Sequence, residues 1–456
     1  MMTLNIVGRL GADPPPNGLA LRRRPAPPVA ETLLIVFVVF VILGMPVGVA
    51  LGVGALAAAT LYPALNPIII PSRFVGLLSD SFIILAAPLF ILAGNIAARG
   101  GVARAIIDLA TALVGRFRGG LAYVNIVDSM IFGGISGSAV ADVSALGTFL
   151  IPQMVRKGYD KDFATVLTIC TAILAPIIPP SIIAVIYAWM ADESVAAIFA
   201  GGYLPGVLIA VGIAVPTFVI ARKRNYPREP APTRAEFIAA VRNALPGLMI
   251  PLIIMGGILL GWFTPTEAAA VAVVYALTIP PLFYKELSWR ELPGIFADSA
   301  RLSGVIGLII GLVGAFGWVL TYSKFPFRVA EFIGTFAPTW WLFMMFVIVL
   351  YVFLGTFLTP SEIILVTVPV LLPGAQALGI HPIHFGMVCV IASAIGHVTP
   401  PVGLCLFLGM AISGLPMEKL VKPLWPFLAA IIVVLFLVAF IPETVLLLPR
   451  LFGFVK

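Results

Sequence analysis

The chain of 456 residues is 61% hydrophobic and only 10% charged, whereas a soluble domain carries about 25% charged residues. This composition excludes an ordinary soluble domain. The formal net charge of +7 does not indicate a nucleic-acid partner, because the basic residues form short runs between apolar stretches, as in the loops that orient membrane proteins. The composition predicts an all-α polytopic membrane protein, embedded in a lipid bilayer and not bound to nucleic acid.

The first 30 residues contain RRRP and many prolines, which predicts a disordered tail at 1–30. The remainder, 31–456, is expected to form a single transmembrane domain. Apolar stretches long enough to cross a bilayer as helices recur along it. The clear examples are 196–221, 245–263, 302–320, 340–358 and 423–442. A cleaved signal peptide explains one such stretch but not a series of them.

The segment 119–155 differs from a simple span. Its two apolar arms flank the polar stretch GGISGSAVAD, and each arm is short for a complete crossing of about 20 residues. Arg116 precedes the segment and Arg156 follows it, so both ends are expected in the cytoplasm. The segment is therefore predicted to be a re-entrant hairpin. Its tip should lie at membrane depth, where non-helical backbone must line a site.

The same spacing of proline, glycine and phenylalanine recurs in the C-terminal half. Pro152, Gly158, Phe163 and Pro179–Pro180 are matched by Pro373, Gly379, Phe385 and Pro400–Pro401. A second hairpin is expected at about 340–376, and its flanks lack Lys and Arg, so it should enter from the periplasm. We therefore predict an inverted-topology repeat, about 80–221 and 302–442, in which each copy holds a re-entrant hairpin and a broken helix. This arrangement is typical of secondary transporters.

The proline pairs and hairpin tips are the candidate sites for ligands. Proline removes backbone donors and clashes with the preceding turn, and the freed carbonyl oxygens suit a hard cation such as Na⁺. Helix N-termini at a break direct partial positive charge toward an anionic substrate. The candidates from these arguments are Pro179, Pro180, Pro400 and Pro401 with the hydroxyls of Ser136, Ser138, Ser181, Thr356, Thr359 and Thr399.

The acidic residues allow two interpretations. Asp142 follows the first tip, where an ionisable residue at membrane depth indicates function; alternatively, it caps the second arm. Asp128 and Asp80 have either a functional or a structural role. Thr266 and Glu267 are expected to cap a helix.

No enzyme is predicted. The chain has three histidines without an HExxH motif and no Walker A motif, so neither catalytic residues nor a cofactor are expected and an ion gradient must supply the energy. The cysteines Cys170, Cys389 and Cys405 are far apart in apolar surroundings, which predicts buried thiols without disulfides or a metal site.

Five motifs within about 35–455 carry a family resemblance: FGGISGSAVAD, APIIPPS, FTPTEAAAVAVVYA, HFG and TPPVGLCLF. With them the chain resembles the DctM-like large membrane subunit of tripartite ATP-independent periplasmic (TRAP) transporters. The resemblance implies a Na⁺-coupled elevator of the ion-transporter-superfamily type, in the bacterial inner membrane. It also implies a small four-helix membrane subunit and a periplasmic binding protein that delivers an organic acid, such as a C4-dicarboxylate or a sugar acid.

The resemblance also implies sodium sites at the two hairpin tips and the facing broken helices. Carried over by motif, these are Ser136, Gly137, Ser138 and Pro179 to Ser181, and Gly355, Thr356, Thr359 and Gly396 to Gly403, which include Thr399. The chain has Thr359 where the family often has a carboxylate, with Glu362 three residues later. Glu362 either replaces the missing charge or caps the second arm. The alternative function is a self-sufficient Na⁺/carboxylate symporter or cation antiporter with the same repeat.

Overall fold

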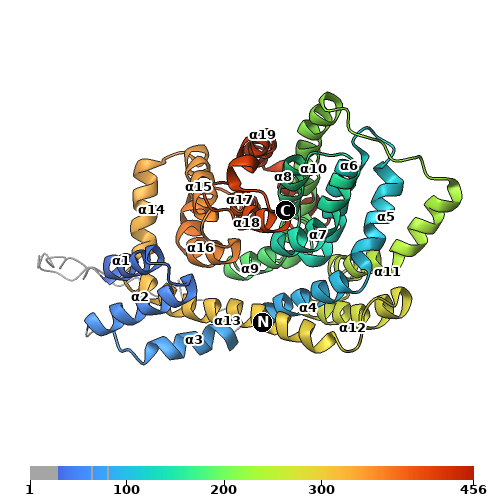
Figure 1. The fold of residues 1–456 in the computed structure, drawn as a ribbon. Coiled ribbons are helices and arrows are strands. Elements are labelled where there is room, and N and C mark those ends of the chain that lie inside the picture. Colours follow the sequence, from blue (N-terminus) through green and yellow to red (C-terminus); the bar gives the residue numbers. More distant parts are fainter. Residues whose placement is uncertain (1–28, 63–64, 80–81, 456) are drawn as a thin grey trace, which may run out of the picture.

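The computed structural model describes residues 29–62, 65–79 and 82–455, and within them it consists of helices and their connections (Figure 1). The predicted tail, 1–30, lies outside these residues except for Val29 and Ala30, which begin α1; Asp80 also lies outside them.

Six described helices are long and apolar enough to cross a membrane, or up to seven if the bent pair of α3 and α4 is one span. The six are α10 (Val195–Lys223), α11 (Arg234–Leu259), α12 (Pro265–Tyr284), α13 (Leu292–Tyr322), α16 (Pro360–Ala377) and α19 (Met417–Phe440). Their length and composition confirm the predicted polytopic membrane protein.

One layer of the molecule combines the N-terminal helices with helices from the middle of the chain. The N-terminal elements are α1 (Val29–Ile42), α2 (Val47–Leu61), α3 (Ile69–Ser79), η1 (Phe82–Leu85), α4 (Ala86–Arg99) and α5 (Val102–Val114). Helices α2, α3 and α4 pack against α13, while α5 and α12 pack against α11. In Figure 1, α3, α13, α4 and α12 form a row along the lower edge. Asn95 of α4 fixes this layer internally, because its Nδ2 donates to Ser299 Oγ of α13 at 2.8 Å.

The other layer contains two series of helices with the same order. The first is α6 (Gly120–Ser136), α7 (Ala139–Arg156), α8 (Lys161–Thr171), η2 (Ala172–Leu174), α9 (Ile182–Met190) and the long α10. The second is α15 (Trp340–Gly355), α16, α17 (Pro382–Gly396), α18 (Leu404–Ser413) and α19; α14 (Phe325–Phe336) and α20 (Glu443–Leu451) flank it. Each series holds two consecutive helices with a tight connection, then a helix that ends several residues before a proline pair, and a short helix beyond that pair.

The stretch 340–358, expected to be long enough for a span, forms only the 16-residue α15. Helix α15 ends at Gly355, and the chain turns before Pro360 begins α16. A full crossing needs about 20 residues, so this helix is the first arm of a two-helix unit and not a separate span.

The N-cap of α12 is not the residue that the sequence predicted. Thr264 Oγ1 accepts from the backbone N–H of Glu267 at 3.3 Å, and Glu267 Oε2 accepts from the N–H of Thr264 at 2.8 Å. The capping role of Glu267 is thus confirmed. Its partner is Thr264 and not Thr266, because Pro265 occupies the first helical position, where proline is favoured; Thr266 lies inside the helix.

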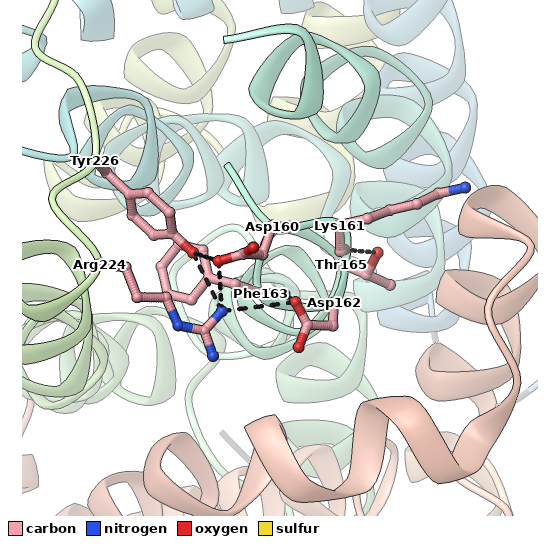
Figure 2. A network of polar contacts seen from close by, with 7 residues as sticks. All are labelled: Asp160, Lys161, Asp162, Phe163, Thr165, Arg224 and Tyr226. Atoms are coloured by element: carbon pink, nitrogen blue, oxygen red, sulfur yellow. Dashed lines mark hydrogen bonds and ion pairs between the residues drawn. The ribbon is translucent and has the colours of Figure 1, made fainter. Parts of the chain in front are cut away.

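A polar network joins the start of α8 to the end of α10 (Figure 2). Arg224 Nη1 and the hydroxyl of Tyr226 both donate to Asp160 Oδ2, each at 2.7 Å, and Arg224 also lies 3.7 Å from Asp162 Oδ1. The rings of Phe163 and Tyr226 pack with centroids 5.1 Å apart. The hydrogen bonds from Tyr226 and then Arg224 lower the pKa of Asp160. The network therefore fixes the position from which the broken helix enters the protein.

We expect Asp160→Asn to lower the free energy of unfolding by about 0.5–1 kcal/mol at pH 7, the value of an exposed ion pair. A lowered carboxyl pKa contributes stability above the unfolded value of about 4 and loses it as the pH falls through the folded pKa. The difference between wild type and variant should therefore vanish in acid. Unfolding of the purified protein by a denaturing detergent at pH 7 and pH 3 measures both. Glu418→Gln, at an exposed carboxylate, is the matched control; equal stability of wild type and Asp160→Asn at pH 7 would contradict the expectation.

Candidate functional site

The first tip rests directly on the first helix break. Gly137 joins α6 to α7 with a φ of 60°, a left-handed conformation that favours glycine. A Cβ at this position would lie 2.9 Å from the carbonyl oxygen of Pro180. Ser138 caps α7 and accepts from the N–H of Ala141 at 3.5 Å. The first tip therefore lies against the proline pair, and Gly137 makes the close approach to Pro180.

Ser181 forms hydrogen bonds with the backbone on both sides of the first helix break. Its hydroxyl donates to the carbonyl oxygen of Pro176 at 2.6 Å and accepts from the N–H of Ala184 at 3.2 Å. Ser181 is fully buried and caps α9. The peptide bond between Pro179 and Pro180 is cis, as is that between Pro400 and Pro401. The hydroxyl holds the ends of the break together and leaves the proline carbonyls facing the tip.

The second tip contacts the second break through its backbone. The N–H of Gly403 donates to the carbonyl oxygen of Thr356 at 3.0 Å. Gly355 and Gly396 meet without side chains, since a Cβ on Gly355 would lie 2.9 Å from Gly396 Cα and 2.7 Å from the carbonyl oxygen of Ser393. Small residues permit such close approach between helices in membranes. The structure thus brings Gly355, Thr356, Gly396 and Gly403 together.

A cavity of about 410 Å³ lies beside the second break. Its polar lining comes from Thr356 and Thr399, with Pro400 and Pro401 next to them, and its remaining walls are apolar residues of α15 and α19. The Thr399 hydroxyl donates to the carbonyl of Ile395 at 2.8 Å, which leaves its oxygen lone pairs free to accept or to coordinate.

The two halves of the site are connected by exchanged packing. Helix α7, the second arm of the first pair, packs against α18, which follows the second break. Helix α16, the second arm of the second pair, packs against α9, which follows the first break. Each tip therefore belongs to the same packed unit as the break of the other series.

Asp142 lies in the first turn of α7 and is fully buried. Its Oδ2 accepts from the hydroxyl of Ser129 on α6 at 2.9 Å. The alternative role as the cap of this arm does not describe the structure, because Ser138 is the N-cap. Asp142 instead joins the two arms below the tip.

Glu362 makes the bond expected of a cap. The N–H of Thr359 donates to Glu362 Oε2 at 2.7 Å, at the start of α16. A carboxylate in the first turn is favoured by the partial positive charge of the helix N-terminus. Thr359 and Glu362 thus lie together at the second tip.

Sequence reasoning missed a buried polar cluster between α6 and α8. Asn125 Nδ2 donates to Thr168 Oγ1 at 2.6 Å, and Thr171 Oγ1 donates to Asn125 Oδ1 at 2.9 Å. All three residues have no exposed surface. The available signal was the spacing of Asn125, Asp128 and Ser129 in an otherwise apolar arm, which places them on one face of the helix.

The histidines divide into two that are bonded and one that is not. His381 Nδ1 caps α17 by accepting from the N–H of Ile383 at 3.2 Å, and His384 Nε2 lies 2.9 Å from the carbonyl oxygen of Val438. His397, in the second break, is buried with neither ring nitrogen hydrogen-bonded.

Comparison with known proteins identifies the family. Residues 34–444 match the model of the tripartite ATP-independent periplasmic transporter, DctM component. The chain is 38% identical over 375 residues to the C4-dicarboxylate TRAP transporter large permease protein DctM of Pseudomonas aeruginosa, covering 82% of this chain and 88% of the relative. It is 36% identical over 409 residues to the sialic acid TRAP transporter large permease protein SiaM of Vibrio cholerae, covering 90% and 96%.

The fold alone is shared with the YdaH transporter of Alcanivorax borkumensis, at a TM-score of 0.60 and 13% identity over 93% of this chain and 98% of that chain. The matched family relatives are permeases and not enzymes. The chain therefore belongs to the large permease subunits of TRAP transporters, secondary transporters of organic acids in the bacterial inner membrane.

Proposed function

We propose that the chain is the translocation subunit of a Na⁺-coupled transporter that imports an organic acid by an elevator movement. The observation that supports this most is that each polar tip rests on a helix break at a proline pair. Such breaks in membrane proteins place backbone carbonyls and helix N-termini at one position, where cations and anionic substrates bind.

The proposed Na⁺ ligands come from both tips and both breaks. They are Ser136, Gly137, Ser138, Asp142, Pro179, Pro180 and Ser181 in the first half, and Gly355, Thr356, Thr359, Glu362, Gly396, Thr399, Pro400, Pro401 and Gly403 in the second. Hard cations take carbonyl, hydroxyl and carboxylate oxygens, and these residues supply all three kinds.

An anionic substrate is favoured by the helix ends that meet at each tip. A Cβ on Gly137 would lie 3.3 Å from the backbone nitrogen of Ile182, so the N-termini of α7 and α9 are neighbours. The bond from Gly403 to Thr356 likewise brings the start of α18 to the second tip. Paired helix N-termini attract carboxylates. We propose a C4-dicarboxylate, a sugar acid or a similar carboxylate.

The movement we propose displaces one layer of the molecule relative to the other. The layer with both helix pairs and both breaks would move with the bound substrate, while the row that contains α13, α4 and α12 would stay fixed. The two helix pairs would be re-entrant hairpins that enter from opposite sides, as the basic flanks of the first and the uncharged flanks of the second favour. An inverted repeat of this kind supports alternating access.

TRAP transporters pair the large permease with a small membrane subunit and a periplasmic binding protein, and we propose both partners for this chain, the small subunit with four helices. The alternative, a self-sufficient symporter or antiporter, requires neither.

Uptake in proteoliposomes tests the function. We expect the chain and its small subunit to import a labelled carboxylate only with the loaded binding protein outside, and faster under an inward Na⁺ gradient than under a K⁺ gradient. Uptake without the binding protein would favour the self-sufficient symporter, and equal rates in both gradients would contradict Na⁺ coupling.

Glu362→Gln separates the charge of Glu362 from its capping bond. Glutamine still accepts from the N–H of Thr359, so thermal stability should be kept. If the carboxylate also supplies charge to a Na⁺ site, the apparent Na⁺ affinity for uptake should fall about tenfold, or about 1.4 kcal/mol. Glu362→Ala, which removes the cap as well, should in addition cost about 0.5–2 kcal/mol of stability. Unchanged Na⁺ affinity in Glu362→Gln would show that the residue is only a cap.

Gly355→Ala tests the contact of the second tip with its break. The added methyl group would lie 2.7 Å from a backbone oxygen, so the tip must move, at a cost of about 1–3 kcal/mol of stability. Uptake should fall with it, while Gly304→Ala in α13, where a Cβ meets open space, should retain both. Wild-type stability and uptake in Gly355→Ala would show that the tip does not need this close approach.

A further inference from the structure

The connection between α5 and α6 lies against the connection between α10 and α11. The N–H of Gly119 donates to the carbonyl oxygen of Pro227, and the N–H of Glu229 donates to the carbonyl oxygen of Gly115, each at 3.0 Å. Gly119 has a φ of 79°, and a Cβ at this position would lie 2.6 Å from the Cβ of Ala221. Both connections run between the two layers of the molecule, and these backbone contacts hold them side by side.

A cavity of about 610 Å³ lies at this junction. Its basic lining comes from the two connections and the last turn of α10, and consists of Arg118, Arg222 and Arg228. In the part of the chain that the structure describes, none of these three side chains forms an ion pair. The neighbouring carboxylate, Glu229, pairs with Lys157 at 3.1 Å instead. The cavity therefore gathers three cationic side chains that no described carboxylate neutralises.

The rest of the cavity wall is apolar and continues along a helix. The rings of Phe117 and Phe218 line it and are 49% and 52% exposed. Val211 and Val215, which are also exposed, precede Phe218 by seven and three residues on α10, so the three side chains lie on one face of the helix. Arg222 follows on the same face, one turn later. Because α10 is long and apolar enough to cross a membrane, this face leads from the hydrocarbon region of the bilayer to the cavity.

The charges and the apolar face together define the chemistry of an occupant. A guanidinium group binds a phosphate through two parallel hydrogen bonds. A free phosphate ion would use the arginines but not the apolar face, whereas a phospholipid uses both. A headgroup with a cation of its own would be repelled by the arginines, so a net negative headgroup is favoured. Basic connections face the cytoplasm, where lysines and arginines near the membrane attract anionic lipids.

We propose that this cavity binds the headgroup phosphate of an anionic phospholipid. Arg118, Arg222 and Arg228 hold the phosphate, and an acyl chain lies along the face of α10 that contains Val215 and Phe218. The bound headgroup contacts both connections between the layers. The site uses none of the proposed Na⁺ ligands and goes beyond the proposed function.

Native mass spectrometry of the purified full chain in detergent, titrated with phosphatidylglycerol, tests the proposal. We expect phosphatidylglycerol to bind more tightly than phosphatidylcholine with the same acyl chains, and excess inorganic phosphate not to displace it. The triple variant Arg118→Gln, Arg222→Gln, Arg228→Gln should bind phosphatidylglycerol about a hundredfold more weakly, because each cation beside an anionic headgroup contributes about fivefold.

A second triple variant is the matched control. Arg156→Gln, Arg234→Gln and Arg290→Gln remove the same charge from exposed arginines that do not line the cavity. This variant should bind phosphatidylglycerol as wild type does. An equal loss of binding in both triple variants would show attraction by overall charge and overturn the proposed site.

Three further results would overturn the proposal. Equal affinity for the two lipids, or unchanged affinity in the variant of the cavity, would show that the arginines do not hold an anionic headgroup. Displacement by inorganic phosphate would assign the cavity to a free anion. Loss of co-purification with the small subunit, at unchanged lipid affinity, would assign it to a protein contact. Should the triple variant not fold, Arg222→Gln alone replaces it, with an expected loss of about fivefold. The measurement needs neither substrate nor a Na⁺ gradient, so its outcome is independent of the transport assay.

Discussion

The structure depends on one constraint: backbone polar groups released by a helix break inside a membrane must be satisfied by the protein itself. At the second break, the N–H of Gly403 donates to the carbonyl oxygen of Thr356 in the second tip. At the first, the hydroxyl of Ser181 bonds on both sides of the break. A break without a polar tip beside it would leave unpaired groups in lipid. The tips and breaks therefore form together, and glycines at Gly137 and Gly355 are what let them meet.

Because helices of each series pack against helices of the other, the two series are mechanically connected. Because α7 packs on α18 and α9 on α16, the helix that leads from each tip supports the half-helix that follows the other break. Displacement of one tip by a ligand would move a helix that shapes the other site. Under the proposed function, packed helices of this kind can carry energetic coupling between the ion and substrate sites.

Proline and glycine spacing carried most of the sequence prediction, because these residues act on the backbone directly. Both helix pairs, both breaks and the clustering of Ser136, Ser181, Thr356 and Thr399 at them followed from it. Side-chain pairing was harder to predict. The sequence pattern predicts Thr266 as a cap, but Pro265 occupies the first helical position and Thr264 is the N-cap. The partner of Asp142 is Ser129, thirteen residues away along the chain. Such pairings depend on how two helices face each other, which local patterns do not encode.

The acidic residues of the two helix pairs lie in different surroundings. Glu362 lies in the first turn of α16, accepts from a backbone N–H and faces the positive end of a helix, so its charge is stabilised where it stands. Asp128 lies mid-helix, where the dipole gives no such help and no donor reaches it. The second pair thus holds its carboxylate at a helix N-terminus, whereas the first pair holds Asp128 and Asp142 fully buried between its arms. The repeat is therefore symmetric in the order of its helices but not in the placement of its acidic residues.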